Sequence, residues 1–277
     1  MTPTRQRVPI QTVGVLGAGR IGRPIIGHLA AKGFNVFAHD PDGAVREAAV
    51  QRGARWAATS RELAQSVDAV LICVGYDREL KALIAAGLLT DLRSGSILAV
   101  LSTVSPHTVQ QIEAAASPLG VHVVDATLCR GGRAADEGTL LSFLAGEAEV
   151  IERLRPVVAC YATDIVYTGA VGSAQVAKAA NNLLMWACLI ANHEALALAK
   201  RFGMDVELLR EALLKTGADN GVLRRWGTST MAWADDDLEI VQSMARQAGI
   251  GLPQAALNRE LCRTLKPRKF RLDEYGI

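Results

Sequence analysis

The sequence predicts an α/β protein, in which a doubly wound, mostly parallel sheet is followed by a smaller all-α domain. Three observations support this prediction. Short runs rich in Val, Ile and Ala alternate with segments of helical period from residue 11 to about residue 168. After Gly172 the strand-like runs stop, and the remaining segments have helical periodicity. A glycine-rich turn separates the first strand-like run from the first helical segment.

Residues 1–170 are predicted to form the sheet domain. Strands are expected in the runs TVGVLG, FNVFAHD, VDAVLICV, SILAVLS, VHVVDA, GTLLSFLAG and DIVYTG. Helices are expected in the segments RPIIGHLAAKG, DGAVREAAVQRG, DRELKALIAAG, SPHTVQQIEAAA and EVIERLRPVVACY. Gly33 is expected to end the first helix, and Ser60 to be the N-cap of a later one.

Residues 171–277 are predicted to form the all-α domain, with a role in substrate binding and oligomerisation. Helices are expected at 173–202, 205–215, 235–249 and 253–265, where glycine and proline residues mark the ends. The final segment, LKPRKFRLDEYGI, is basic and then acidic. Two interpretations of it are open: a solvated tail, or a segment that closes over a neighbouring active site.

The composition favours a globular protein with a small-molecule partner. Half of the residues are hydrophobic, and 30 basic residues nearly balance 28 acidic ones, so nothing in the net charge indicates a nucleic acid or a membrane surface as partner. The five cysteines are scattered without a CxxC pair, which predicts neither disulfides nor a metal site and fits a reducing compartment.

A membrane or secreted location is not expected. The N-terminal residues lack the apolar region of a signal peptide, and the longest uninterrupted apolar run, residues 183–191, has nine residues. A helix needs about 20 apolar residues to span a bilayer. We therefore expect a soluble, cytoplasmic protein.

The stretch VGVLGAGRIGRPI has the GxGxxG spacing at the end of the first strand. Gly17 permits the tight turn, Gly19 lets the backbone approach a pyrophosphate, and Gly22 lets the helix pack on the strand. The free N–H groups at the start of the following helix would bind the phosphates. A Rossmann-type dinucleotide site is therefore predicted, formed by Gly17, Ala18, Gly19, Arg20, Ile21 and Gly22.

Asp40 ends the second predicted strand, about 20 positions after Gly19. Its carboxylate can accept hydrogen bonds from the adenosine ribose and would repel a 2′-phosphate. Pro41 follows it, where an arginine would accommodate that phosphate. NAD is therefore predicted rather than NADP, although Arg46, one turn into the next helix, could reverse this preference.

Three polar clusters could meet at the reactive end of the cofactor. LSTVSP and DATLCRGG follow predicted strands, and ligands bind at the carboxyl ends of the strands in such sheets. The third cluster lies in the helix GSAQVAKAANNLL, where Gln175, Lys178 and Asn182 fall within an arc of roughly 60 degrees. The apolar neighbours of Lys178 would favour an uncharged amine, which suits proton exchange. The helix alone leaves open the alternative that Lys178 only extends into solvent.

Five motifs in this order resemble the β-hydroxyacid dehydrogenases, the group of 3-hydroxyisobutyrate dehydrogenase that is related to 6-phosphogluconate dehydrogenase. They are GAGRIGRP, LSTVSP, DATLCRGGRAADEGTL, GAVGSAQVAKAANNLL and DDDLEIVQSMARQAGIGLP, and the resemblance runs from about residue 12 to residue 262. It implies an oxidoreductase that transfers a hydride between a nicotinamide cofactor and a small 3-hydroxy acid, or the matching semialdehyde or keto acid. It also implies a homodimer or homotetramer that assembles through the long helix and the all-α domain.

The resemblance also implies roles for individual residues. Lys178 would be the general acid and base, and Asn182 would orient the substrate beside it. Val74 and Thr103 would contact the cofactor. The loop after Asp125 would hold the substrate carboxylate through backbone N–H groups. The residues expected to bind substrate are Ser102, Cys129, Arg130 and Gly131.

The chain departs from the family pattern at five positions. Ala174 replaces a second glycine before the helix with Lys178, and Val100 replaces an acid two residues before the Ser-Thr pair. Cys129 replaces the usual serine, and Arg130 replaces the first glycine of that motif. A thiol is a poor hydrogen-bond donor, whereas Arg130 could bind a carboxylate or phosphate, or could instead point to solvent. Asp236 stands where a lysine usually approaches the cofactor.

The sequence therefore leaves two alternatives to a hydroxyacid dehydrogenase open. The altered loop and the missing lysine favour a non-catalytic, dinucleotide-binding regulatory protein, whereas Lys178 and Asn182 argue against it. The other alternative is a reductase of an imine or another carbonyl on the same scaffold, and the retained Lys178 argues against imine reduction.

Overall fold

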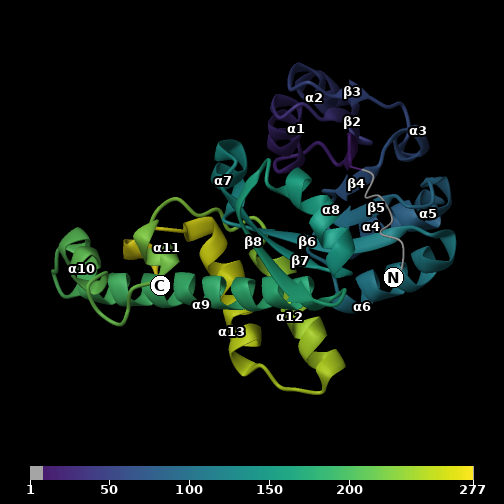
Figure 1. The fold of residues 1–277 in the computed structure, drawn as a ribbon. Helices are drawn as coiled ribbons and strands as arrows, with labels where there is room; N and C mark the ends of the chain where they lie inside the picture. The colour runs from purple at the N-terminus through teal and green to yellow at the C-terminus, as the bar shows by residue number, and fades with distance from the viewer. Residues whose placement is uncertain (1–8, 277) are drawn as a thin grey trace. The chain divides into compact units, whose positions relative to one another are not determined.

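The computed structural model describes residues 9–276 and contains two compact units, Met1–Lys178 and Ala179–Ile277. The predicted fold class is confirmed, because the first unit holds a mostly parallel sheet covered by helices and the second is helical (Figure 1). The division between the units lies within helix α9 (Ser173–Arg201), whereas the sequence places the domain boundary at residues 170 and 171.

The sheet has eight strands in the order β3-β2-β1-β4-β5-β6-β7-β8. All neighbouring strands are parallel except β6 and β7, which are antiparallel. The strand order reverses between β1 and β4, and ligands bind at such switch points, beyond the carboxyl ends of the strands. The strands are β1 (Thr12–Leu16), β2 (Asn35–His39), β3 (Arg55–Trp56), β4 (Ala69–Ile72), β5 (Ile97–Val100), β6 (His122–Cys129), β7 (Leu140–Ala145) and β8 (Ala162–Gly169).

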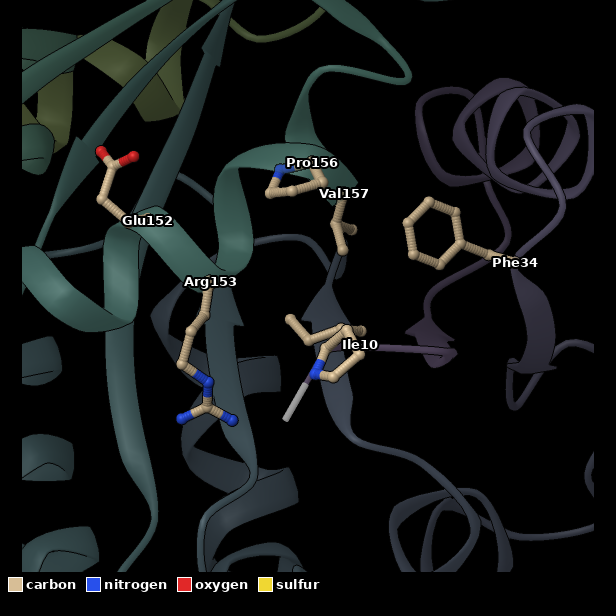
Figure 2. Close-up of a pocket in the computed structure, with 7 residues that line it drawn as sticks. Ile10, Phe34, Glu152, Arg153, Pro156 and Val157 are labelled. Carbon is tan, nitrogen blue, oxygen red and sulfur yellow. The ribbon is translucent and has the colours of Figure 1, made fainter. Parts of the chain in front are cut away.

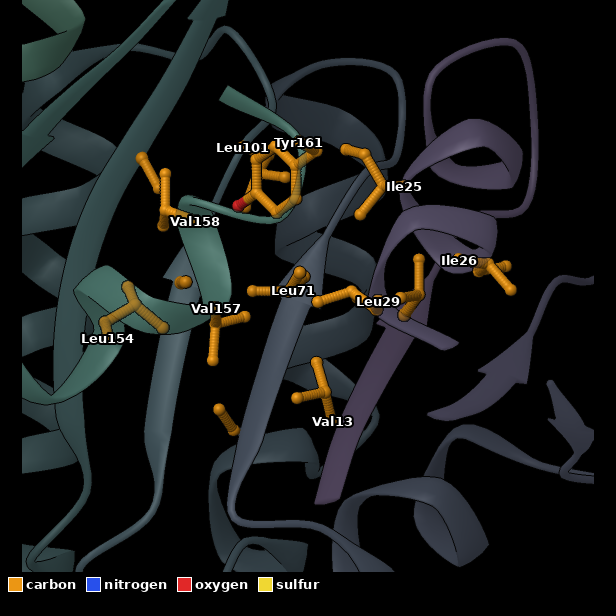
Figure 3. Packing of buried hydrophobic residues seen from close by; sticks show 14 of the residues in the cluster. Val13, Ile25, Ile26, Leu29, Leu71, Leu101, Leu154, Val157, Val158 and Tyr161 are labelled. Atoms are coloured by element: carbon orange, nitrogen blue, oxygen red, sulfur yellow. The ribbon is translucent and has the colours of Figure 1, made fainter. Parts of the chain in front are cut away.

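Helices cover both faces of this sheet. They are α1 (Gly22–Ala31), α2 (Arg46–Gln51), α3 (Ser60–Ser66), α4 (Asp77–Ala85), α5 (Leu88–Asp91), α6 (Pro106–Ala116), α7 (Gly131–Glu137) and α8 (Ala148–Val158). Successive residues of one strand point to opposite faces. Thus Leu71 packs with α1 and α8 (Figure 3), whereas its neighbours Val70 and Ile72 pack with α3, α4 and α6.

The two predicted helix ends have different outcomes. Gly33 follows the end of α1 with φ +88°, a left-handed conformation that favours glycine, so this prediction is confirmed. The N-cap of α3 is Thr59 rather than Ser60, because the Thr59 hydroxyl accepts the N–H of Glu62 at 3.1 Å. Sequence patterns did not predict the short elements β3, α5 and α7, which span too few residues to show a period.

The second unit is built from helices, which continue from α9 and pack around the side chains of Trp186, Leu189 and Leu238. The four helices predicted here are confirmed, with ends within two residues of those expected, and the four-residue α11 was not predicted. After α9 they are α10 (Val206–Leu213), α11 (Gly221–Arg224), α12 (Ala234–Ala248) and α13 (Pro253–Leu265).

Helix α9 has 29 residues, and its length and composition alone would allow it to cross a membrane. Half of its most apolar 18-residue window is buried within the protein. The core helices of globular proteins share both properties, so these features are weak evidence for a membrane span.

The C-terminal segment packs against α9. His193 makes the central contact: its Nδ1 donates to the Leu189 carbonyl at 2.9 Å, and its Nε2 accepts the N–H of Phe270 at 2.8 Å. The Tyr275 hydroxyl donates to Glu194 at 2.9 Å, and Leu272 is buried. The interpretation of this segment as a solvated tail is therefore wrong for the residues up to 276.

Candidate active site

The glycine loop after β1 has the geometry that a dinucleotide requires. Gly17 has φ +97°, and a Cβ atom there would collide with the Cys73 carbonyl; a Cβ on Gly22 would collide with the Gly17 carbonyl. These two glycines are thus needed for the chain's own packing. A Cβ on Gly19 would meet no atom within 4 Å, so this backbone is open to a close-lying pyrophosphate. No side chain caps α1. In its first turn the Arg23 N–H donates to the Gly19 carbonyl at 3.2 Å and Pro24 has no N–H, so phosphate oxygens would rely on the glycine loop and the very start of the helix.

Asp40 connects the end of β2 to the glycine loop. Its Oδ2 accepts the N–H of Ala18 at 2.7 Å, and its Oδ1 accepts the N–H of Asp42 at 2.9 Å. The carboxylate therefore supports the loop, and it also places negative charge at the position where the adenosine ribose is bound in this fold.

Arg20, within the glycine motif, is held by helix α7. Its guanidinium forms two hydrogen bonds with the Asp136 carboxylate, at 2.9 and 2.6 Å, and lies over Gly132. The hydrogen bonds from Arg20 lower the pKa of Asp136. Both side chains are about half exposed, so this pair stabilises the fold by no more than about 1 kcal/mol.

Ser102 joins the carboxyl ends of β4 and β5. Its buried hydroxyl donates to the Val74 carbonyl at 2.8 Å, so this hydroxyl is engaged with the backbone. Val74 and Thr103, which are expected to contact the cofactor, are half-buried. These segments follow β4 and β5, next to the strand that carries the glycine loop, which is the edge predicted for the ligand.

Four buried hydrogen bonds fix the beginning of α9 to the ends of β5 and β6. Gln175 Oε1 accepts the N–H of Val104 at 3.0 Å, and its Nε2 donates to the Ser102 carbonyl at 3.1 Å. The Thr127 hydroxyl donates to the Ala174 carbonyl at 3.1 Å. From β6, Asp125 accepts the N–H of Gly172 at 2.8 Å.

Lys178 lies on α9 three residues after Gln175, close to one helical turn beyond this anchored segment. Its side chain is half-buried. Within the part of the chain that the structure describes, its amine has no hydrogen-bond acceptor and no carboxylate partner. An amine with this exposure is accessible to a ligand at the sheet edge.

Asp125 is a buried carboxyl group whose importance the sequence did not reveal. Its burial raises its pKa from 3.8 to about 7, although the N–H groups of Gly172, Gln175 and Ala174 favour the ionised form. The first turn of α9 contains no acidic residue, and Asp125 is the carboxyl group that accepts the backbone N–H of Gly172 just before it. The sequence signal was a single acid in the apolar run VHVVDA.

The predicted loop after Asp125 is wrong as far as Cys129, because β6 continues through these residues and pairs with β7. The physical reason is the antiparallel pairing, which extends β6 beyond the end of β5. Since side chains alternate along a strand, Asp125, Thr127 and the buried Cys129 share one face, and the first two contact the start of α9. Gly131 begins helix α7.

Arg130 lies between β6 and α7 with φ +83°, a conformation that is uncommon for residues other than glycine. Its guanidinium forms an ion pair with Asp164 at 2.7 Å and donates to the Thr139 carbonyl and the Thr163 hydroxyl. The hydrogen bond from Arg130 lowers the pKa of Asp164. The interpretation that Arg130 points freely to solvent is therefore wrong, and binding of a substrate carboxylate by it would require exchange of this partner.

Two residues of the second unit were considered in the sequence: Asn182 as a predicted site residue and Asp236 as a departure from the family pattern. Asn182 is buried; its Oδ1 accepts from Asn181 at 3.1 Å, while its Nδ2 has no acceptor among the described residues. Asp236 is exposed in the first turn of α12, and the next residue, Asp237, is buried and accepts the indole N–H of Trp186 at 3.1 Å.

A cavity of about 220 Å³ lies away from these residues (Figure 2). Pro9 and Ile10 lie just before β1, and Phe34 directly precedes β2, so the cavity lies at the amino ends of these strands. The glycine loop follows the other end of β1. Its lining is Pro9, Ile10, Phe34, Glu152, Arg153, Pro156 and Val157, and none of them is a predicted site residue.

Comparison with known families accounts for both halves of the chain. Residues 12–169 match the family described as the NAD binding domain of 6-phosphogluconate dehydrogenase. The chain belongs to the β-hydroxyacid dehydrogenase family. Residues 172–273 match the domain described as the NAD-binding domain of NADP-dependent 3-hydroxyisobutyrate dehydrogenase. As a member of this family, the protein is a nicotinamide-dependent oxidoreductase of the hydroxyacid dehydrogenase type.

Individual members of the β-hydroxyacid dehydrogenase family are similar over most of their length. The chain is 28% identical to the NAD-dependent L-serine dehydrogenase of Pseudomonas aeruginosa, over 87% of this chain and 84% of that one. It is 29% identical to the 3-hydroxyisobutyrate dehydrogenase of the same organism, over 76% and 72% of the two chains. Its fold is similar to that of a Mycobacterium tuberculosis 3-hydroxyisobutyrate dehydrogenase studied with L-serine, with TM-score 0.86, 21% identity and coverage of 94% and 95%.

The raised pKa of Asp125 predicts a pH-dependent stability. Between its unfolded value of 3.8 and its folded value of about 7, the native state retains a proton that the unfolded chain releases. The contribution of Asp125 to the free energy of unfolding is therefore present at low pH and lost as the pH rises towards about 7. Asp125→Asn cannot ionise, and its amide oxygen can still accept the N–H of Gly172.

We expect wild-type protein to lose stability relative to Asp125→Asn as the pH rises from about 4 to about 7, by about 1 to 4 kcal/mol. Urea denaturation of both proteins, followed by tryptophan fluorescence at a series of pH values, measures this difference. Parallel stability curves would contradict the assignment of the titrating group to Asp125.

Proposed function

We propose that the protein is an NAD-dependent dehydrogenase of a small 3-hydroxy acid, or of the matching semialdehyde or keto acid, with Lys178 as general acid and base. The observation that carries this proposal is the half-buried amine of Lys178, which has no partner among residues 9–276. It follows a helix start that is hydrogen-bonded to the segment after β5, at the sheet edge that bears the glycine loop. The L-serine and 3-hydroxyisobutyrate dehydrogenases among its relatives act, by their names, on acids of this class.

The chemistry divides between the cofactor and the protein. The bound nicotinamide supplies an acceptor for the hydride that leaves the substrate carbon. Lys178 takes the proton from the substrate hydroxyl during oxidation and returns it to the carbonyl oxygen during reduction. Asn182 orients that oxygen, for which its unpartnered Nδ2 is a suitable donor. Val74 and Thr103 hold the nicotinamide half of the cofactor at the ends of β4 and β5.

The substrate carboxylate is assigned to the segment at the end of β6 and the start of α7. Cys129, Gly131 and the neighbouring Ser102 are the residues that we expect around it. The hydroxyl of Ser102 is bonded to Val74, and the thiol of Cys129 is a weak donor, so the backbone is the stronger source of hydrogen bonds here. Arg130 can bind the substrate carboxylate directly only if its ion pair with Asp164 breaks.

NAD is the proposed cofactor because Asp40 places a carboxylate beside the glycine loop, and Asp42 lies two residues further on. A 2′-phosphate at this position would meet both negative charges. No cation takes part in the hydrogen bonds that the structure describes for Asp40. The exposed Arg46 is the nearest lysine or arginine in sequence.

We also propose a cytoplasmic homodimer or homotetramer. Helix α9 and the residue that follows it expose large apolar side chains, with Leu184 67% exposed, Leu198 61% and Phe202 81%. Exposed apolar surface of this kind marks interaction sites, and a second copy of the chain is the partner that the family resemblance implies.

Replacement of Lys178 tests the catalytic assignment. We expect Lys178→Ala to lower kcat by about 10²-fold or more, because proton transfer by a positioned group contributes about 10²- to 10⁴-fold. Its affinity for NADH should change by less than about threefold, since Lys178 is not part of the glycine loop. The measurement is absorbance of the reduced cofactor with a panel that includes 3-hydroxyisobutyrate, L-serine and the corresponding aldehydes. Normal turnover by Lys178→Ala would refute the role of Lys178.

Replacement of Asp40 tests the cofactor preference. In Asp40→Ser the hydroxyl can still bond to a ribose but no longer repels a phosphate. We expect the ratio of kcat/KM for NAD over NADP to fall by about tenfold or more, which corresponds to about 1.4 kcal/mol. A wild-type enzyme that already prefers NADP would contradict the assignment.

Light scattering of the purified protein tests the proposed assembly. The chain has a mass of 29.5 kDa, and we expect a species of two or four times that mass. Leu198→Glu should shift the distribution towards smaller species, because a charge in an apolar interface is costly. A monomeric wild-type protein would overturn the proposal.

A further inference from the structure

The side chain of Gln175 connects helix α9 to residues 102–104, two segments whose relative position matters for the proposed reaction. Its Oε1 accepts the N–H of Val104 at 3.0 Å, and its Nε2 donates to the Ser102 carbonyl at 3.1 Å. One amide group thus bonds to the residues on both sides of Thr103. The same side chain is part of α9, three residues before Lys178.

Because these groups are buried, the loss of either hydrogen bond would be costly. Gln175 is 1% exposed and Ser102 is 5% exposed, so water does not readily replace a lost partner. A shorter side chain would not span the gap, and a carboxylate would offer no donor to the Ser102 carbonyl. The amide has both a donor and an acceptor and satisfies both backbone groups at once.

We infer that Gln175 is a positioning residue that sets the distance between the cofactor segment 102–104 and the proton-accepting amine of Lys178. This inference rests on the proposed function, in which Thr103 contacts the cofactor and Lys178 exchanges the proton. Hydride and proton leave neighbouring atoms of the substrate, so their two acceptors must be aligned on the same bound molecule. An error of about 1 Å in such an alignment can lower the rate by about 10²-fold.

The other contacts to the start of α9 do not provide this link. Thr127 and Asp125 bond to Ala174 and Gly172 from strand β6, and neither contacts residues 102–104 through the hydrogen bonds described for it. They fix the helix to the sheet, whereas Gln175 fixes it to the segment proposed to hold the nicotinamide. Thr127 therefore offers a matched control, because it also forms a buried hydrogen bond to the first turn of α9 but does so from strand β6.

The test compares Gln175→Met with Thr127→Val. Methionine has nearly the length of glutamine but lacks the strong donor and acceptor, and valine has the shape of threonine without the hydroxyl. The substrates are 3-hydroxyisobutyrate and L-serine. We expect Gln175→Met to lower kcat by about tenfold or more, with NADH affinity within about threefold of wild type and a larger primary deuterium isotope effect. Thr127→Val should keep kcat within about threefold.

A double variant separates positioning from general destabilisation. If Gln175 acts through its alignment with Lys178, the Lys178→Ala and Gln175→Met losses should not multiply, and the double variant should be within about twofold of Lys178→Ala alone. A purely structural role would lower activity by the same factor in both backgrounds, in step with a lower Tm, and would overturn the inference.

The outcomes also distinguish this inference from the proposed function. A slow Lys178→Ala together with a normal Gln175→Met would refute the positioning role alone. Normal turnover by Lys178→Ala, or no turnover of either substrate by the wild-type enzyme, would refute the proposed function and this inference with it. Equal losses in Gln175→Met and Thr127→Val would show that the two tethers to this helical turn are needed alike, and would refute the specific role of Gln175.

Discussion

The attachment of the first turn of α9 to the ends of β5 and β6 is the constraint on which the candidate site depends. A helix start buried against a sheet edge must find partners for its free N–H groups and for any polar side chain that it buries. Here Asp125 and Thr127 bond to the helix backbone, and Gln175 bonds back to the segment after β5. Of these contacts, the two made by Gln175 connect the helix that carries Lys178 to the segment after β5.

The strand order of the sheet determines where the cofactor-binding part of the candidate site lies. Because the strand order reverses between β1 and β4, the glycine loop and the segments after β4 and β5 lie at neighbouring strand ends. Asp40 and Ser102 use their side chains to hold these ends together. Several residues expected to touch ligands therefore also support the backbone, and their substitution would alter stability as well as binding.

The sequence predicted the sheet, its helices and the glycine loop because each of these has a local signal. Alternating runs of apolar residues reveal strands, and GxGxxG with Asp40 reveals a dinucleotide site. The contacts of Asp125, Gln175 and Arg130 could not be predicted in this way. Each joins residues between 9 and 73 positions apart, and a local sequence pattern does not show which distant residues pair. The extension of β6 to Cys129 was missed for the same reason.

Two of the departures from the family pattern lie in that same region. Arg130 adopts a backbone conformation that suits the glycine it replaces and is held by Asp164 on β8, while Cys129 is buried on the face that Asp125 and Thr127 share. These differences alter the surroundings of the substrate and leave the anchored helix start unchanged. The altered segment is therefore expected to affect the choice of substrate more than the proton transfer.

A crystal structure of the protein with NADH and a bound 3-hydroxy acid would show whether Lys178 faces the reacting atoms. We expect the Lys178 amine to lie within hydrogen-bonding distance, about 3 Å, of the substrate hydroxyl, and the reacting carbon to lie about 3.5 Å from the nicotinamide. Both Gln175 hydrogen bonds should persist. A substrate bound with its hydroxyl on another residue, and Lys178 directed into solvent, would contradict this expectation.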